Sequence, residues 1–198
     1  MTAKGIFCLE GIWDNDLRKR STVEPILLLL KQRLGIPYIH RDCATVHEFE
    51  FYLSKFIQAT YKKYPILYLA FHGKEGSIMF NGRESYSLDE MSDSLKGKCK
   101  KTVIIIGSCS TMDIRKQHLK SFLSNTGALA VCGYRNDVDW MRSTAFELLL
   151  LSELQHNIFD GRGVKSIAER SNRLAKSFRL PDSDKNIDFK MVSIADSC

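Results

Sequence analysis

Hydrophobic and polar positions follow two alternating patterns along this chain. Short continuous apolar runs are typical of buried strands, and apolar residues three or four positions apart are typical of amphipathic helices. The first pattern predicts strands over residues 5–13, 38–43, 66–71, 102–106, 128–133 and 189–194. The second predicts helices over 23–34, 45–61, 113–123, 139–155 and 164–178, with a further short helix that begins at Ser87 or Asp89.

Capping and turn residues mark several boundaries between these elements. Gly35 predicts the end of the first helix, and Thr45 and Asp139 are predicted N-caps. Residues 77–87 predict a β-hairpin that turns at the Asn-Gly pair 81–82, because this pair is favoured in tight hairpin turns. Strands that alternate with helices predict an α/β sandwich with a mostly parallel sheet.

Composition and charge exclude several broad classes of protein. The chain is 44% hydrophobic and 26% charged, which is typical of a globular protein, and we expect one domain over residues 1–198. It has no apolar run of about 20 residues and no secretory signal at its start, so we expect a cytoplasmic protein without a membrane partner. The net charge of +6 comes from Lys and Arg that are interspersed with acids and lack interleaved aromatic residues, which argues against nucleic-acid binding.

Cysteine spacing and the acids near the first strand indicate neither disulfides nor a metal. No Cys-x-x-Cys pair occurs, and we predict free thiols for Cys8, Cys43, Cys99, Cys109, Cys132 and Cys198. Glu10, Asp14 and Asp16 offer carboxylates, but no His or Cys near them completes a ligand set. We therefore predict a solvated loop there, no metal and no other cofactor, and we interpret His40 as an ordinary, partly exposed histidine.

Two candidate catalytic side chains follow predicted buried strands. In parallel α/β sheets the functional residues lie at the carboxyl ends of strands, and His72 and Cys109 both occupy such positions. If their strands are neighbours, about 4.8 Å apart, imidazole and thiol meet at one edge of the sheet. The imidazole can then take the thiol proton and later protonate the leaving amine. The N–H groups of Gly73 and Cys109 are the predicted oxyanion-hole donors.

The chain resembles the caspase-like (clan CD) cysteine peptidases in two blocks, ILYLAFHG (66–73) and TVIIIGSC (102–109). The downstream block GALAVCGY (127–134), followed by a long helix, is similar to the CHAT-domain and bacterial caspase-like members. This resemblance implies a three-layer sandwich with a mostly parallel six-stranded sheet flanked by helices. It also implies a Cys-His dyad, with His72 as general acid/base and Cys109 as nucleophile. The implied activity is a cysteine endopeptidase that acts on a protein or peptide substrate in a bacterial defence or signalling pathway.

The same resemblance implies a pocket beside the nucleophile for the residue that precedes the scissile bond. Asp139 matches the Asp of the CHAT pattern, and with Asp137 and Ser108 it is a predicted substrate-binding residue. An acidic pocket would select Arg or Lys. The alternative is a pocket formed by Arg135 and the basic segment 18–20, which would select an acidic side chain.

In place of the caspase signature Gln-Ala-Cys-Arg-Gly the chain has Gly-Ser-Cys-Ser-Thr at 107–111, which points away from caspases that cleave after aspartate.

Two other classes of function remain open from the sequence. One alternative is a non-catalytic caspase-like module that binds a peptide or a regulatory partner. The other is a flavodoxin-like domain in which His72 and Cys109 are coincidental, although the acids that a receiver needs at its strand ends are sparse.

Overall fold

The computed structural model describes residues 3–16, 18–81, 83–178 and 187–197. Its main sheet has six strands, which lie in the order β2 (Tyr38–Cys43), β1 (Ile6–Gly11), β3 (Ile66–Ala70), β7 (Val103–Gly107), β8 (Ala130–Tyr134) and β9 (Phe189–Ser193). The first five strands in this order are parallel and β9 is antiparallel to β8. A smaller antiparallel sheet contains β4 (His72–Lys74), β5 (Ser77–Phe80) and β6 (Glu84–Ser87).

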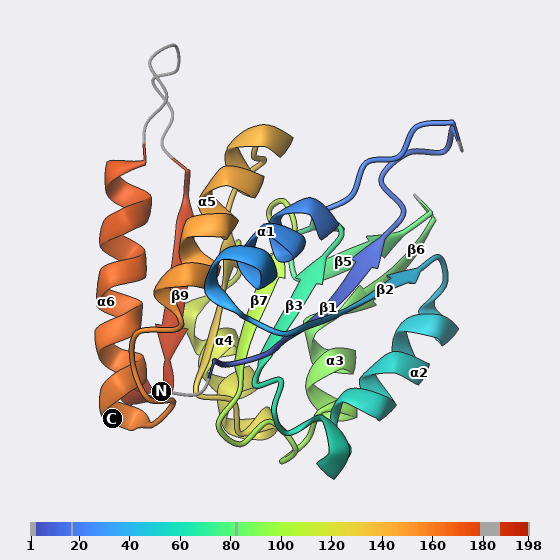
Figure 1. Cartoon of the computed structure of the whole chain (residues 1–198). Helices are drawn as coiled ribbons and strands as arrows, with labels where there is room; N and C mark the ends of the chain where they lie inside the picture. The colour runs from blue at the N-terminus through green and yellow to red at the C-terminus, as the bar shows by residue number, and fades with distance from the viewer. Residues whose placement is uncertain (1–2, 17, 82, 179–186, 198) are drawn as a thin grey trace.

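Helices cover both faces of the main sheet and give the molecule three layers (Figure 1). One face is covered by α1 (Glu24–Leu34), α5 (Trp140–Glu153) and α6 (Gly161–Ser177). The other is covered by α2 (Val46–Phe56), α3 (Leu88–Ser94) and α4 (Lys116–Thr126). Two short 3-10 helices complete the described elements, η1 (Ala59–Tyr61) and η2 (Ile194–Ser197). The predicted three-layer α/β sandwich with a mostly parallel six-stranded sheet is confirmed.

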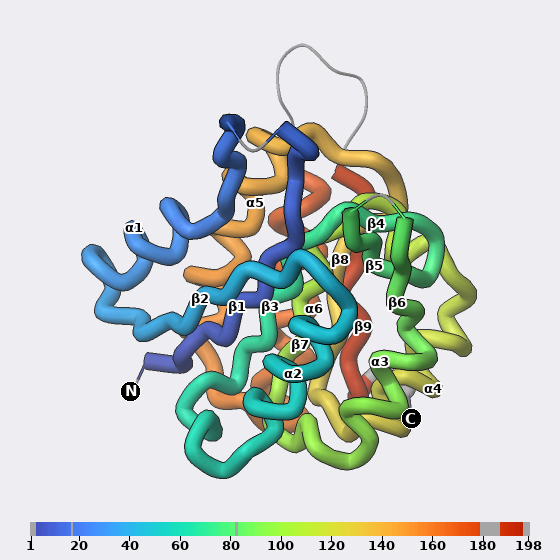
Figure 2. The backbone as a smooth tube through the Cα atoms, turned by 90° about the vertical axis from the view of Figure 1, so that its right-hand side faces the viewer, coloured from blue at the N-terminus to red at the C-terminus, as the bar shows by residue number. Residues whose placement is uncertain are grey.

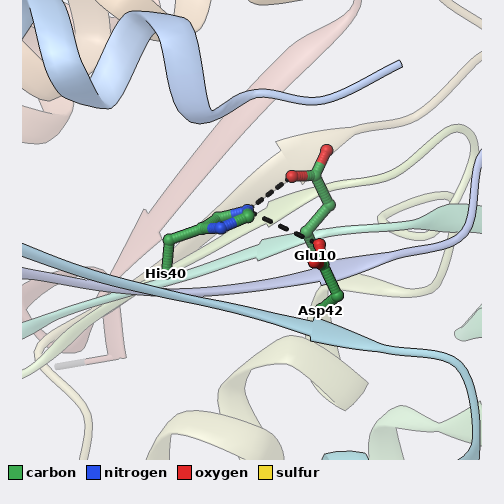
Figure 3. Close-up of side chains that lie close together, drawn as sticks. All are labelled: Glu10, His40 and Asp42. Atoms are coloured by element: carbon green, nitrogen blue, oxygen red, sulfur yellow. Dashed lines mark hydrogen bonds and ion pairs between the residues drawn. The ribbon is translucent and has the colours of Figure 1, made fainter. Parts of the chain in front are cut away.

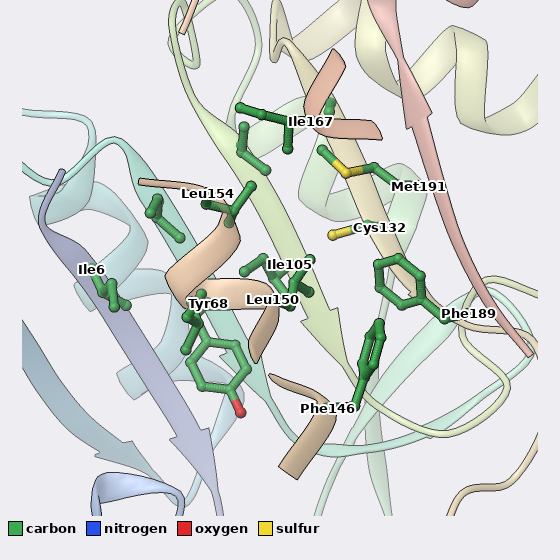
Figure 4. Close-up of a cluster of buried hydrophobic side chains, with 14 of the residues drawn as sticks. Ile6, Tyr68, Ile105, Cys132, Phe146, Leu150, Leu154, Ile167, Phe189 and Met191 are labelled. Atoms are coloured by element: carbon green, nitrogen blue, oxygen red, sulfur yellow. The ribbon is translucent and has the colours of Figure 1, made fainter. Parts of the chain in front are cut away.

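Alternation of side chains along the central strands builds a separate core on each face. In β1, Ile6 joins the core under α1, α5 and α6, while Phe7 joins the core on the opposite face. Figure 4 shows the first core, where Phe146 of α5 packs beside Phe189 of β9 with ring centroids 4.8 Å apart. Each such buried side chain stabilises the fold by roughly 1.5–3 kcal/mol through loss of apolar contact with water.

The capping and turn signals of the sequence act as predicted. Gly35 ends α1 in the left-handed conformation (φ 65°), and Thr45 caps α2. The side chain of Asp139 accepts a hydrogen bond from the first turn of α5. The predicted hairpin is formed by β5 and β6, with Asn81 at φ 47°, and Gly82 lies outside the described residues.

Several elements differ from the sequence prediction. The strand predicted over 5–13 ends at Gly11, and the helix predicted over 164–178 begins at Gly161. The helix predicted over 45–61 ends at Phe56, and the remainder contains the separate turn η1. The helix predicted over 113–123 begins at Lys116, because the N–H of Asp113 bonds back to a turn at Ser110. His72 does not end its strand in a loop, since it opens β4 and pairs with β5.

The order of the five parallel strands is that of a flavodoxin-like sheet. The antiparallel strand β9 and the small sheet distinguish this chain from a flavodoxin-like domain. In Figure 2 the small sheet lies above α3, beside the edge of the main sheet at which the parallel strands end. This edge therefore contains both the strand ends and β4.

Candidate active site

The candidate active site lies where the neighbouring parallel strands β3 and β7 end. Ala70 at the end of β3 pairs with Gly107 at the end of β7, and His72 and Cys109 each follow two residues later. The backbone of Gly73 packs against the loop that contains Cys109. A Cβ atom added to Gly73 would lie 2.5 Å from the Cys109 carbonyl oxygen, which only glycine avoids. The fold thus brings the His-Gly and Ser-Cys dipeptides together.

The loop after β7 is held from two sides. Ser110 adopts a left-handed conformation (φ 56°), uncommon for a non-glycine residue, and turns the chain directly after Cys109. Its N–H donates to the carbonyl oxygen of Asn136 (3.1 Å), and its hydroxyl donates to Asp137 (3.0 Å). On the other side the hydroxyl of Thr111 donates to the first carbonyl oxygen of β5 (3.3 Å). The β8–α5 loop and the small sheet together fix the position of Cys109.

The thiol of Cys109 is half-buried and contacts the backbone of Val138. The Val138 N–H donates to Sγ (3.5 Å), and Sγ lies 3.8 Å from the Val138 carbonyl oxygen. Burial raises the pKa of the Cys109 thiol, the bond from Val138 lowers it, and the charge of Asp137 raises it further, so that the net shift is upward. Within the described part of the chain, the side chains of Cys109 and His72 share no hydrogen bond. The resting protein therefore holds Cys109 as a neutral thiol.

The exposed ring of His72 is oriented by Trp13, which lies in the loop after β1. Nε2 of His72 is 2.9 Å from the carbonyl oxygen of Trp13. Because a carbonyl oxygen only accepts hydrogen bonds, Nε2 carries the hydrogen and Nδ1 is left as the base. The Trp13 indole packs edge-on against His72 and against Trp140, with ring centroids 5.1 Å and 4.5 Å apart. Trp13 was not predicted from the sequence, because its bond to His72 comes from the backbone.

Trp13 is in turn bound to a buried carboxylate, Glu10, which is 1% exposed near the end of β1. Glu10 accepts hydrogen bonds from the Trp13 indole N–H (2.5 Å), the Thr22 hydroxyl (2.7 Å) and the Val23 N–H (2.8 Å). Its Oε2 also lies 2.6 Å from Nε2 of His40 (Figure 3). Burial lowers the pKa of His40, but the hydrogen bond and charge of Glu10 outweigh burial and raise it above its ordinary value.

Two interpretations made from the sequence are wrong here. Glu10 does not lie in a solvated loop, and His40 completes a set of three potential metal ligands with Glu10 and Asp42, whose donor atoms lie within 4.8 Å of one another. The parallel pairing of β1 with β2 places Glu10 opposite Asp42, which no local spacing reveals. Both oxygens of Glu10 already accept bonds from protein donors. We therefore interpret the cluster as a hydrogen-bond hub and assign no metal to it.

A second buried carboxyl group lies beneath β7. Glu147 of α5 is 4% exposed and accepts hydrogen bonds from the hydroxyls of Tyr68 (2.5 Å) and Tyr134 (3.0 Å). It packs against Gly107, where an added Cβ atom would lie 2.8 Å from Oε1 of Glu147. Burial raises the pKa of Glu147 to about 7, although the two tyrosine hydroxyls lower it. The burial of Glu147 was predictable from the sequence, because it is the single acid within the apolar segment 146–151.

The predicted substrate-binding residues have different surroundings. Asp139 is exposed, and its carboxylate accepts the N–H of Arg142 (3.1 Å) as the N-cap of α5. Asp137 is exposed and accepts the hydroxyl of Ser110. Ser108 is 2% exposed, and its hydroxyl has no partner among the described residues. Asp137 therefore lies near the candidate nucleophile and raises its pKa, Asp139 caps α5, and Ser108 is buried.

The cysteine thiols agree with the sequence prediction as far as the structure describes them. Cys8, Cys43, Cys99, Cys109 and Cys132 are free. Cys198 lies outside the described residues. Among the helices of the described ranges, none is long and apolar enough to span a bilayer.

Comparison with known proteins places the chain in a family and supports the fold. Residues 3–180 match the proteins described as "Family of unknown function (DUF6642)". The chain belongs to this family. No curated protein sequence matches this DUF6642 member. It is similar in structure to the crystal structure of Caspase-1 from Spodoptera frugiperda, with a TM-score of 0.61, 13% sequence identity, and coverage of 97% of this chain and 87% of the other.

At this low identity the likeness concerns the fold alone, and the predicted caspase-like architecture of the DUF6642 member is confirmed. The similarity to CHAT-domain members is not addressed by these matches and stays a prediction.

Proposed function

We propose that the protein is a cysteine endopeptidase in which Cys109 is the nucleophile and His72 the general acid/base. The single observation that carries this proposal is the register of β3 and β7, which puts His72 and Cys109 two residues beyond a paired Ala70 and Gly107. The hydrogen bond from His72 Nε2 to the Trp13 carbonyl oxygen also supports the proposal. This bond leaves Nδ1 of His72 free to accept a proton.

The raised pKa of the Cys109 thiol sets the order of events in the proposed mechanism. Since the resting thiol is neutral, its proton moves to Nδ1 of His72 as Sγ bonds to the substrate carbonyl carbon. The carbonyl oxygen becomes an oxyanion near the N–H groups of Cys109 and Gly73. The C–N bond then breaks and the amine leaves with the proton from His72. Water finally supplies a hydroxyl group to the acyl carbon and a proton to Sγ, which releases the acid and restores the thiol.

A basic residue before the scissile bond fits the charges around Cys109. Asp137 and Asp139 are exposed on the loop that contacts the thiol. Arg135 on the same loop lies 3.4 Å from Asp113 and 3.9 Å from Asp188, so it already pairs with acids. These contacts favour selection of Arg or Lys over the acid-accepting alternative.

One observation favours a second candidate function, a non-catalytic module that binds a peptide or a regulatory partner. In the described residues the dyad is not joined by a hydrogen bond, and the thiol pKa is raised rather than lowered. Activated thiols in enzymes have lowered pKa values, so this resting state suits a site that does not react unless a ligand rearranges it.

Mass spectrometry after treatment with a library of peptidyl electrophiles tests the proposal and separates the two candidates. We expect labelling at Cys109, fastest with Arg or Lys beside the electrophile, and at least about tenfold slower labelling in His72→Ala, as for loss of a general base. The Cys109→Ala variant locates the label, and Cys198 is the reference thiol. Labelling of Cys109 no faster than Cys198, with or without a bound peptide, would instead support the non-catalytic module.

A further inference from the structure

The loop that carries Trp13 is joined to the main sheet through the Trp13 side chain. Residues 12–16 form neither helix nor strand, and residues 11–14 border a cleft of about 320 Å³ that Thr22 and His40 also line. Trp13 contacts three groups on its inner side: the ring of His72, the ring of Trp140 and the carboxylate of Glu10. Of these only Glu10 belongs to the main sheet and makes a hydrogen bond to the indole.

Glu10 is itself held by a partner on the neighbouring strand. His40 of β2 lies 2.6 Å from Oε2 of Glu10, and its side chain is only 10% exposed. A hydrogen bond to a carboxylate is shorter and stronger than one between two neutral groups. The chain of contacts runs from His40 to Glu10, from Glu10 to the Trp13 indole, and from the Trp13 carbonyl oxygen to His72.

We propose that the Glu10–His40 pair is a positioning device for the general base, acting through Trp13 to hold the ring of His72 with its hydrogen on Nε2 and its lone pair on Nδ1. This inference rests on the proposed function, since it assigns the pair a role in that same site. Neither residue touches the substrate or the reacting atoms. Their effect is on the tautomer and orientation of His72, and a shift of about 1 Å in such a group can cost roughly a hundredfold in rate.

Three variants separate this positioning role from a general contribution to folding. His40→Leu removes the donor to Glu10, whereas His40→Gln restores an N–H donor at a similar distance and is the rescue variant. Trp13→Phe keeps the aromatic ring and the backbone carbonyl oxygen but deletes the indole N–H that binds Glu10. His156→Leu is the matched control, because His156 is exposed and lies outside this chain of contacts.

The first measurement is the nitrogen NMR spectrum of His72, which reports its tautomer and does not require activity. We expect the wild-type protein, His40→Gln and His156→Leu to hold the hydrogen on Nε2. We expect His40→Leu and Trp13→Phe to show a mixture of tautomers and faster exchange of the Nε2 hydrogen with water. Should His40→Leu fail to fold, Trp13→Phe provides the same comparison.

The second measurement is turnover of the peptide that the electrophile library selects. We expect kcat to fall about tenfold to a hundredfold in His40→Leu and Trp13→Phe with KM nearly unchanged, because only the base is displaced. An unaltered His72 spectrum in both folded variants would overturn the positioning role even if the protein is an active peptidase. A changed spectrum in a protein without turnover would support the positioning role and contradict the proposed function.

Discussion

Two buried glutamates lie under the two halves of the candidate site and have opposite surroundings. Glu10, near His72, is paired with a histidine and accepts three further hydrogen bonds. Glu147, near Cys109, has no cation among its described partners and accepts hydrogen bonds from two tyrosines. The first carboxyl bonds a histidine whose pKa is raised, and the second has no basic partner among the described residues.

The difference indicates separate roles for the two halves. A carboxylate with hydrogen bonds to both oxygens fixes its neighbours in one geometry, as the proposed general base requires. An uncompensated buried carboxyl changes its charge near neutral pH, since burial raises the pKa of Glu147 to about 7. Its negative charge also adds to the rise in the pKa of the Cys109 thiol. The half of the site at His72 is therefore held by the hydrogen bonds of Glu10, whereas the thiol pKa in the half at Cys109 responds to the charge of Glu147.

Replacing Glu147 by Gln gives the largest expected effect and tests this contrast directly. In the native state the pKa of Glu147 is raised from 4.5 to about 7, so the folded protein binds this proton more tightly than the unfolded chain. The resulting stability is fully present below pH 4.5 and is lost as pH rises to 7, a change on the order of 3 kcal/mol. Gln stays neutral, can bond both tyrosines, and removes this loss.

Denaturant unfolding at several pH values between 4.5 and 8 measures the change. Glu153→Gln is the control, because Glu153 also lies on α5 but pairs with Arg170 on the surface side. If the unfolding free energy falls equally with rising pH in the wild-type protein and in Glu147→Gln, a group other than Glu147 binds the proton. The same variant should lower the pKa of Cys109, which the pH dependence of its alkylation reports.

Gly73→Ala breaks the contact that joins the two halves. The new methyl group would lie 2.3 Å from Oγ1 of Thr111 and 2.5 Å from the Cys109 carbonyl oxygen, so β4 and the nucleophile loop must separate. We expect a loss of about 1–3 kcal/mol in stability, as for other overpacked positions, and slower labelling of Cys109. Gly161→Ala is the matched control, since its Cβ meets no atom within 4 Å. Equal labelling rates in both variants would show that close packing at Gly73 is not needed.

The fold was predictable from the sequence because its strands are short apolar runs with clear ends. The runs around β3 and β7 also pointed to His72 and Cys109 as candidates, since parallel strands bring their carboxyl ends to one edge. The small sheet was harder to predict in full, because β4 is a polar segment of three residues without alternation. The direction of β9 depends on tertiary packing and is not encoded in its apolar pattern.

The surroundings of the two catalytic candidates were less predictable. Glu10 and His40 are 30 positions apart and meet only through the register of β1 with β2. Trp13 orients His72 through a backbone carbonyl oxygen, and every residue type has one. Glu147 could have been found, because a lone acid among leucines in a helix must be buried or break the apolar face.

Asp139 offers the smallest effect and separates a structural role from a binding role at one position. Its carboxylate caps α5, so Asp139→Ala should lower the unfolding free energy by about 1 kcal/mol. Asp139→Asn should leave stability nearly unchanged, because Asn caps helices as well as Asp does but has no charge. If the exposed charge also binds a basic substrate side chain, both variants raise KM for Arg or Lys substrates while only Ala destabilises the protein. A KM for Asp139→Asn equal to that of the wild-type protein would leave Asp139 with the capping role alone. Substrate recognition would then fall to Asp137, which lies on the same loop and accepts a hydrogen bond from Ser110, the residue after Cys109.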